Sequence, residues 1–250
     1  MKIAVTGKGG VGKTTTVANI GTGLASLGHK VVLLDTDIGL RNLDVVMGLE
    51  NRIVYDIVDA ATGQCKLKQA MIKDKRFENM YLIPAAQTKD KNAVNESQMK
   101  AICEELKEEF DFILIDCPPQ LSILTINALS CADGVLIPVK TDYLAYRGLT
   151  QLQDSIREIQ ELINPDLQVM GVIATLYDTR VTDDREILGL LKEEYNLLGV
   201  VKRLAVAKKG IYDGLAVVEQ APNSEISAEY KAVAEMIISG NMKREEQCHG

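Results

Sequence analysis

The sequence predicts an α/β fold: a doubly wound, mainly parallel sheet with helices on both faces. Short continuous apolar runs recur along the chain, which is typical of strands buried on both faces of a parallel sheet. Longer segments with helical periodicity alternate with these runs, and no repeat, low-complexity tract or linker interrupts the alternation. We therefore expect a single domain over residues 1 to 240, followed by a polar tail over residues 241 to 250.

Each expected element corresponds to one segment of this alternation. The apolar runs predict strands at residues 3 to 5, 31 to 34, 80 to 83, 112 to 115, 135 to 139, 169 to 175 and 199 to 201. Helical patterns cover residues 16 to 27, 54 to 61, 93 to 110, 142 to 163, 183 to 195 and 224 to 239. Cys103 falls on the apolar face of its helix and is predicted to be a core residue. Gly240 is predicted to end the last helix.

Composition narrows the class of protein. The 250 residues are 46% apolar, enough for a sizeable core, and their net charge of −7 argues against a strongly basic nucleic-acid-binding domain. Five cysteines, with no CxxC pair, argue against a disulfide framework or a zinc site and fit a reducing cytosol. No apolar run approaches the length needed to span a bilayer, and the first strand leaves no room for a signal peptide. We expect a cytoplasmic protein, with peripheral attachment to a membrane or to the nucleoid left open.

A phosphate-binding loop follows the first strand. Gly7, Gly12, Lys13 and Thr14 match the pattern G-x-x-x-x-G-K-[ST] between a strand and a helix. Glycines let backbone N–H groups face phosphate oxygens, and the following helix presents its positive N-terminus to the same anion. We expect ATP to bind here, with Lys13 on the β- and γ-phosphates and Thr14 on Mg²⁺. The predicted contacts are Gly9, Gly10, Val11, Gly12, Lys13, Thr14 and Thr15.

Acidic residues follow two of the predicted strands. Asp35 and Asp37 end the second strand, in the crevice where open parallel sheets bind ligands, although both side chains could instead cap the next turn. Asp116 ends the apolar run at residues 112 to 115, an arrangement that delivers a carboxylate to Mg²⁺ through water. Residues 117 to 120, Cys-Pro-Pro-Gln, suit either a segment that senses the γ-phosphate or a rigid turn.

Lys8 gives the loop a second lysine, and the loop then resembles the deviant Walker A motif of the ParA/MinD ATPase superfamily. The resemblance implies a P-loop NTPase fold and a homodimer that sandwiches ATP, with Lys8 reaching the phosphates of the partner subunit. It also implies that Asp37 positions the attacking water, that Thr14 and Asp116 hold Mg²⁺, and that a protein activator stimulates a slow ATPase. Asp178 aligns with a position where family members often place an asparagine near adenine, but an aspartate cannot donate to a ring nitrogen.

The resemblance differs between the two halves of the chain. Residues 35 to 56 and 82 to 91 look like the MinD division-site ATPases, whereas residues 124 to 129, 136 to 139 and 176 to 180 look more like ParA/Soj partition ATPases. We favour division-site placement, with partition of plasmid, chromosome or other cargo as the alternative. The polar tail lacks the amphipathic membrane-targeting helix usual in MinD proteins.

Three further features leave other interpretations open. The basic cluster Lys202, Arg203, Lys208 and Lys209 is either a solvated surface or a contact for DNA or another partner. An iron–sulfur reductase component shares the deviant loop, but here Cys103, Cys117 and Cys131 do not match the cysteine positions that such proteins use to bridge a cluster, so no iron–sulfur cluster is expected. A P-loop ligase or kinase would need an acceptor pocket, and no constellation of residues indicates one.

Overall fold

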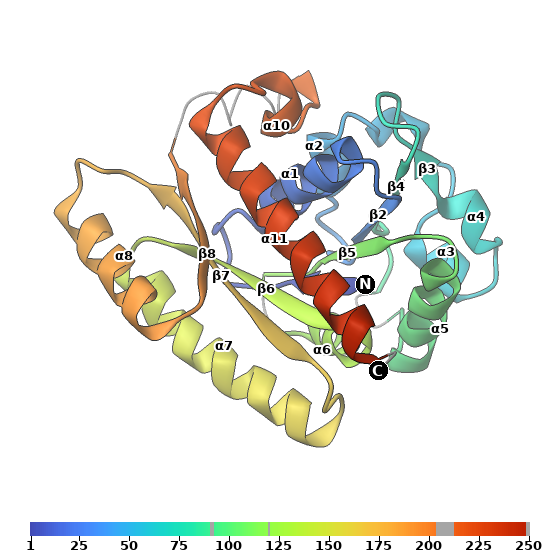
Figure 1. The fold of residues 1–250 in the computed structure, drawn as a ribbon. Coiled ribbons are helices and arrows are strands. Elements are labelled where there is room, and N and C mark those ends of the chain that lie inside the picture. Colours follow the sequence, from blue (N-terminus) through green and yellow to red (C-terminus); the bar gives the residue numbers. More distant parts are fainter. Residues whose placement is uncertain (91–92, 120, 204–212, 249–250) are drawn as a thin grey trace.

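The computed structural model describes residues 1–90, 93–119, 121–203 and 213–248, with the backbone alone for residues 241–248. Its centre is an eight-stranded sheet in the order β3-β4-β2-β5-β1-β6-β7-β8 (Figure 1). Every described pairing is parallel except that of β3 with β4. The strands are β1 (Lys2–Val5), β2 (Val31–Asp35), β3 (Ile72–Lys73), β4 (Met80–Ile83), β5 (Phe112–Asp116), β6 (Gly134–Lys140), β7 (Gln168–Tyr177) and β8 (Leu197–Lys202).

Helices cover both faces of the sheet. One face carries α1 (Lys13–Ser26), α2 (Leu43–Val46), α10 (Val217–Gln220) and α11 (Glu225–Cys248), and Figure 1 shows α11 crossing in front of the strands. The other face carries α3 (Ile57–Ala61), α4 (Leu67–Ala70), α5 (Glu96–Lys107), α6 (Ile123–Cys131), α7 (Tyr143–Leu162) and α8 (Thr182–Glu194). A short 3-10 turn, η1 (Glu50–Arg52), follows α2.

The strands are apolar throughout because both of their faces are covered. Along β2, Val31 and Leu33 pack towards α1 and α11, whereas Val32 and Leu34 pack towards the helices on the opposite face. Side chains of a strand point alternately to the two faces, so a strand between two helical layers needs apolar residues at every position. The predicted doubly wound architecture is confirmed.

Several predicted boundaries differ from the structure by a few residues, and two of the differences have a clear physical reason. The helix expected from residue 54 begins at Ile57, because the Asp56 side chain accepts hydrogen bonds from the backbone N–H groups of Val58 and Asp59 and caps it there. The last helix continues through Gly240 to Cys248, so the prediction that Gly240 ends it is wrong. Glycine within a helix costs only about 1 kcal/mol, and it ends a helix where the backbone turns left-handed.

The predicted basic cluster and the segment after Asp116 are only partly described by the structure. Lys202 ends β8 and Arg203 follows it, whereas Lys208 and Lys209 of the basic cluster lie outside the described residues, as does Gln120. Within the described part of the chain, no helix combines the length and apolar character that crossing a bilayer requires.

Candidate nucleotide-binding site

The glycine-rich loop connects β1 to α1 at the carboxyl edge of the sheet. Gly10 and Gly12 have φ values of 75° and 85°, in the left-handed region where a side chain would be strained. Gly7 packs against β6, where a Cβ atom would lie 2.9 Å from the Pro138 carbonyl oxygen. Glycine is therefore required at these three positions by the path of the backbone.

Two hydrogen bonds fix this loop to the sheet. The Thr175 hydroxyl, near the end of β7, donates to the Val11 carbonyl oxygen at 2.8 Å. The backbone N–H of Thr6 donates to the Leu136 carbonyl oxygen of β6 at 3.2 Å. Helix α1 then starts at Lys13, directly after Gly12, so the free N–H groups of its first turn face the same space as the loop.

The strand register brings the predicted acids to the loop. Asp116 at the end of β5 lies beside Val5 on one side and beside Asp35 at the end of β2 on the other. The Thr36 hydroxyl also donates to the Asp116 carbonyl oxygen at 2.7 Å, which holds the two strand ends together. Residues more than a hundred positions apart in the chain are thus assembled around one cleft.

The Asp116 carboxyl group is fully buried at the end of β5. Burial raises the pKa of its carboxyl group to about 7, against the opposing effects of a hydrogen bond from the Thr14 hydroxyl and of the Lys13 charge. Its Oδ1 atom is buried without a hydrogen-bond partner among the described residues. An orphaned, fully buried carboxylate oxygen is costly and marks a position that is suited to a cation or a metal-bound water.

Lys13 supplies positive charge to the same cleft. Its Nζ atom donates to the Lys8 carbonyl oxygen at 3.1 Å, so the side chain folds back over the loop. Burial lowers the pKa of the Lys13 ammonium group, and the negative charge of Asp116 partly opposes this shift. The ammonium group is therefore largely desolvated in the nucleotide-free protein. Phosphate oxygens of a bound nucleotide would replace its weak partner, the Lys8 carbonyl oxygen.

Asp35 has a structural role that the sequence did not separate from that of Asp37. Its carboxylate accepts hydrogen bonds from the backbone N–H groups of Asp37 at 2.9 Å and Leu43 at 3.2 Å. Burial raises its pKa well above the usual range, and the neighbouring Asp116 charge adds to this. Asp35 thus shapes the turn that presents Asp37, and its own oxygens face inward. The position of Asp35 at the end of the apolar strand, directly before the turn, was the sequence signal that its side chain is buried.

Asp37 is half-buried and lies on the wall of a cleft of about 560 Å³ beside the loop. Gly9, Gly10, Gly12, Lys13, Thr14 and Thr15 line this cleft together with Asp37, Cys117 and Pro119. The structure therefore brings the loop, the second acid and the segment after Asp116 to one space. Cys117 itself is buried in the core, and burial raises the pKa of its thiol.

Lys8 and Asp178 lie away from this cleft wall. Lys8 is exposed, and its Nζ atom donates to the Leu144 carbonyl oxygen of α7 at 3.3 Å. Both carboxylate oxygens of Asp178 accept from the Arg180 guanidinium group, at 2.9 and 2.7 Å, and this pairing lowers the Asp178 pKa. An adenine contact by Asp178 would have to compete with Arg180 and stays a prediction.

The residues present fit a magnesium nucleotide. The loop offers backbone N–H groups and the Lys13 ammonium group to an anion, and Thr14 and Asp116 offer two oxygens to a hard cation. The unpartnered Oδ1 atom of Asp116 is the observation that favours a cation, because the cation would satisfy it.

Comparisons with known proteins agree with this geometry. A family model described as an AAA domain (AAA_31) matches residues 1–169. The septum site-determining protein MinD of Bacillus subtilis is 43% identical over 238 residues, which cover 94% of this chain and 88% of that protein. The chain belongs to the MinD family of ParA/MinD ATPases.

Solved MinD structures have the same fold. MinD from Pyrococcus horikoshii, complexed with Mg-ADP, superposes with a TM-score of 0.82 at 25% identity and covers 94% of each chain. The MinC:MinD cell division protein complex from Aquifex aeolicus matches with a TM-score of 0.81 at 30% identity and covers 96% of each chain. The predicted P-loop ATPase fold and the MinD character of the first half are confirmed, and the MinD similarity extends over the second half as well.

Proposed function

We propose that this MinD-family ATPase is a switch that dimerises on ATP and places the division site. The observation that carries the proposal is the separation of the two loop lysines. Lys13 folds back over its own loop, whereas Lys8 extends outward to α7 and is exposed. A lysine whose ammonium group is directed to α7, away from its own nucleotide cleft, is available to the phosphates of a second subunit.

Each residue of the cleft then has one task. Thr14 and Asp116 would hold Mg²⁺, which would neutralise phosphate charge when bound. Lys13 binds the phosphates of its own subunit, and Asp37 orients the attacking water. Lys8 approaches the γ-phosphate of the partner subunit and stabilises the charge that develops there, as an arginine finger does.

The charges explain why dimerisation would require ATP. Two loop faces brought together without nucleotide would place cationic lysines opposite one another with nothing to neutralise them. ATP supplies the negative charge that both faces bind, and its hydrolysis removes the bridging phosphoryl group. A difference of about 3 to 5 kcal/mol in binding free energy between the two states moves a population from mostly free to mostly bound.

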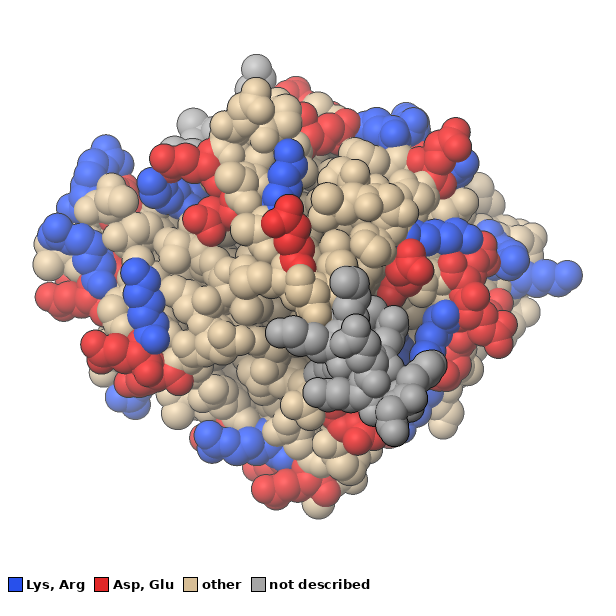
Figure 2. Space-filling model, in the orientation of Figure 1, with Lys and Arg blue, Asp and Glu red and all other residues tan. Residues whose placement is uncertain are grey.

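The proposal includes a homodimer in the ATP state. It also includes a partner protein that stimulates the slow hydrolysis of ATP. The Aquifex aeolicus relative occurs in a complex with MinC, which supports a protein partner here as well. We place the ADP state in the cytoplasm and the ATP dimer on a surface that the assays below identify as a membrane or DNA. On the face of the molecule drawn in Figure 2, Lys and Arg side chains are interspersed with Asp and Glu and do not form one basic field.

Two parallel assays with the full chain test this proposal. Sedimentation with ATP or ADP measures dimerisation, and co-sedimentation with anionic liposomes measures attachment. We expect an ATP-specific dimer that pellets with liposomes. Dimerisation that is equal in ATP and ADP would contradict the switch. ATP-dependent binding to non-specific DNA, falling steeply with salt and without liposome binding, would instead establish the partition alternative.

A further inference from the structure

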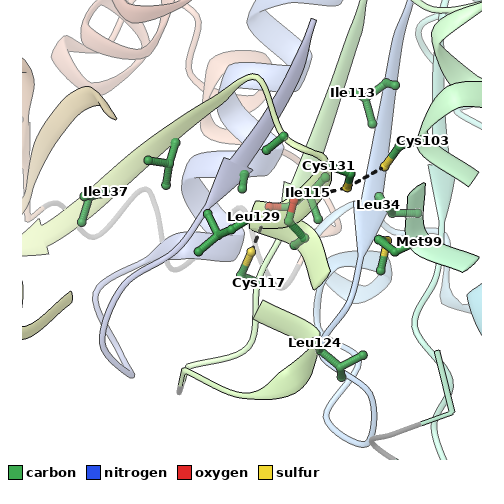
Figure 3. Close-up of a cluster of buried hydrophobic side chains, with 14 of the residues drawn as sticks. Leu34, Met99, Cys103, Ile113, Ile115, Cys117, Leu124, Leu129, Cys131 and Ile137 are labelled. Carbon is green, nitrogen blue, oxygen red and sulfur yellow. Dashed lines mark hydrogen bonds between the residues drawn. The ribbon is translucent and has the colours of Figure 1, made fainter. Parts of the chain in front are cut away.

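Two cysteines that the ATPase cycle does not use meet in the core. Cys103 lies in the middle of α5 and Cys131 is the last residue of α6, and their Sγ atoms are 3.3 Å apart (Figure 3). The two thiols are free, and they come from helices that pack side by side on one face of the sheet. We propose that Cys103 and Cys131 form an intramolecular disulfide under oxidising conditions, which makes this pair a redox modification site.

The pair lies at the edge of the sheet opposite the nucleotide loop. Cys131 lines a cleft of about 440 Å³ at the amino ends of β1 and β6, together with Lys2, Glu104, Asp133 and Asn164. Cys131 is 8% exposed, whereas Cys103 is fully buried behind it. A small oxidant can therefore reach Cys131 first, and Cys103 is placed to act second.

The backbone around Cys131 is held in place. The Asn164 side chain donates to the carbonyl oxygens of Leu129 and Ala132, both at 2.8 Å, and satisfies two of the acceptors at the end of α6. The Asn127 side chain donates to the Val94 carbonyl oxygen at 2.9 Å and ties α6 to the chain just before α5. With both helices anchored, the sulfur atoms meet without an unfolding step.

The surroundings of the Cys103 thiol have opposing effects on its ionisation. The Lys2 ammonium group lies 2.7 Å from Glu104 and 3.8 Å from Asp133, and its positive charge acts on the Cys103 thiol. The hydrogen bond with Cys131 and burial nevertheless raise the Cys103 pKa. The first attack is therefore assigned to Cys131, and the second step becomes intramolecular, which offsets the low thiolate content of Cys103.

The reaction balances with a peroxide as the oxidant. The Cys131 thiolate attacks one peroxide oxygen, the O–O bond breaks, and Cys131 becomes a sulfenic acid as water leaves after protonation. The Cys103 sulfur then attacks the Cys131 sulfur, the S–O bond breaks, and the leaving hydroxide takes the Cys103 proton and departs as a second water. Two thiols lose two electrons in total, and hydrogen peroxide is reduced to two waters.

The disulfide would join α5 to α6 covalently. Cys117 and Pro119 line the nucleotide cleft, and α6 begins four residues after Pro119, so the bond would fix the far end of the helix that follows this segment. In a reducing compartment such a bond is transient and reports oxidative conditions. It would also close a loop of the unfolded chain, and we expect the oxidised protein to unfold at a temperature several degrees higher.

Peptide mapping of the full chain tests the proposal. Reduced protein, with and without hydrogen peroxide, is alkylated, digested without reductant and examined by mass spectrometry. We expect a linked peptide pair carrying Cys103 and Cys131, two hydrogens lighter than the sum of the thiol forms and released by dithiothreitol. Amide exchange in α5 and α6 should slow on oxidation.

Single substitutions supply the controls. Cys65→Ser should leave the linked pair intact, whereas Cys131→Ser should abolish it and leave Cys103 reduced. The wild-type mapping decides the question even if a variant folds poorly. Cys131 recovered as sulfinic acid beside a reduced Cys103, a bond between any other two cysteines, or an unchanged Cys103 and Cys131 while Cys65 is oxidised would overturn the proposal.

Discussion

The Lys8 ammonium group donates a hydrogen bond to the carbonyl oxygen of Leu144, 3.3 Å away in the first turn of α7. This contact places the second lysine of the loop outside its own nucleotide cleft. A neutral carbonyl partner in an exposed position holds an ammonium group weakly, so phosphate oxygens of a second subunit can replace it. The Lys8 side chain therefore contacts α7 in the single subunit and would contact bound phosphate in the proposed dimer.

Lys8→Ala should therefore separate nucleotide binding from dimerisation. We expect the variant to bind ATP about as well as the wild type but to remain monomeric, with stimulated hydrolysis lower by about 10³-fold. Equilibrium binding of a fluorescent nucleotide, sedimentation and phosphate release measure these three quantities. Lys13→Ala is the matched control and should lose nucleotide binding itself. An ATP-dependent Lys8→Ala dimer with normal hydrolysis would show that the bridging role is wrong.

Asp37→Asn should slow hydrolysis and leave assembly intact. The side-chain amide keeps the size of the carboxylate but is a poor acceptor for the proton of an attacking water. We expect hydrolysis to fall by about 10² to 10⁴-fold while ATP binding and the ATP dimer persist. Single-turnover phosphate release and sedimentation give the two readouts. If the variant fails to bind ATP, Asp37 supports the cleft instead of the chemistry.

Asp116 makes stability depend on pH in a predictable direction. Its pKa is about 7 in the folded protein and 3.8 in the unfolded chain, so between these values the folded state holds a proton that the unfolded state has lost. The free energy of unfolding of the nucleotide-free protein should therefore fall as pH rises from about 4 to about 7. Asp116→Asn should gain about 2 to 4 kcal/mol relative to the wild type at pH 8 compared with pH 5.

Urea unfolding at the two pH values, without Mg²⁺ or nucleotide, measures this difference. Because a divalent cation favours the ionised carboxylate, Mg-ADP should bind the wild type more tightly at pH 8 than at pH 6. Asp116→Asn should bind Mg-ADP weakly at both values. A pH profile of unfolding that Asp116→Asn leaves unchanged would assign the dependence to another group, such as the buried Asp35 carboxyl group.

Arg76 lies in the turn between β3 and β4 and joins three separate segments of the chain. Its guanidinium group contacts the Asp74 carboxylate at 2.9 Å and donates to the carbonyl oxygens of Gly214 at 2.8 Å and Met47 at 3.0 Å. Arg76→Ala leaves the buried Asp74 without its charged partner, so we expect a loss of about 1 to 3 kcal/mol in the free energy of unfolding.

The exposed pair of Arg157 with Asp154 provides the control for Arg76. Arg157→Ala should change the free energy of unfolding by less than about 0.5 kcal/mol, because exposed ion pairs are screened by water and salt. Urea denaturation of both variants measures the comparison. Equal effects would mean that the three-segment contact adds little beyond a surface ion pair.

Much of the site could be predicted because its signals are local. The loop from Gly7 to Thr15 carries its own conformational requirements, and the apolar runs before Asp35 and Asp116 mark strand ends at one edge of a parallel sheet. The helical patterns do not include α6, because this helix is apolar around most of its surface and shows no stripe. The prediction that Gly240 ends the last helix was wrong because a glycine within a helix and a glycine that ends one look alike in a sequence.

The sequence by itself determined the parallel strands, the phosphate loop and the family, because each depends on neighbouring residues or on a motif. The tertiary structure alone decided that Asp35 faces inward as a support for Asp37, that Lys8 points away to Leu144, and that Cys103 meets Cys131. The physical reason is that strand register and helix packing bring together segments far apart in the chain. Burial and the new neighbours that result then set the charge state and reach of each side chain.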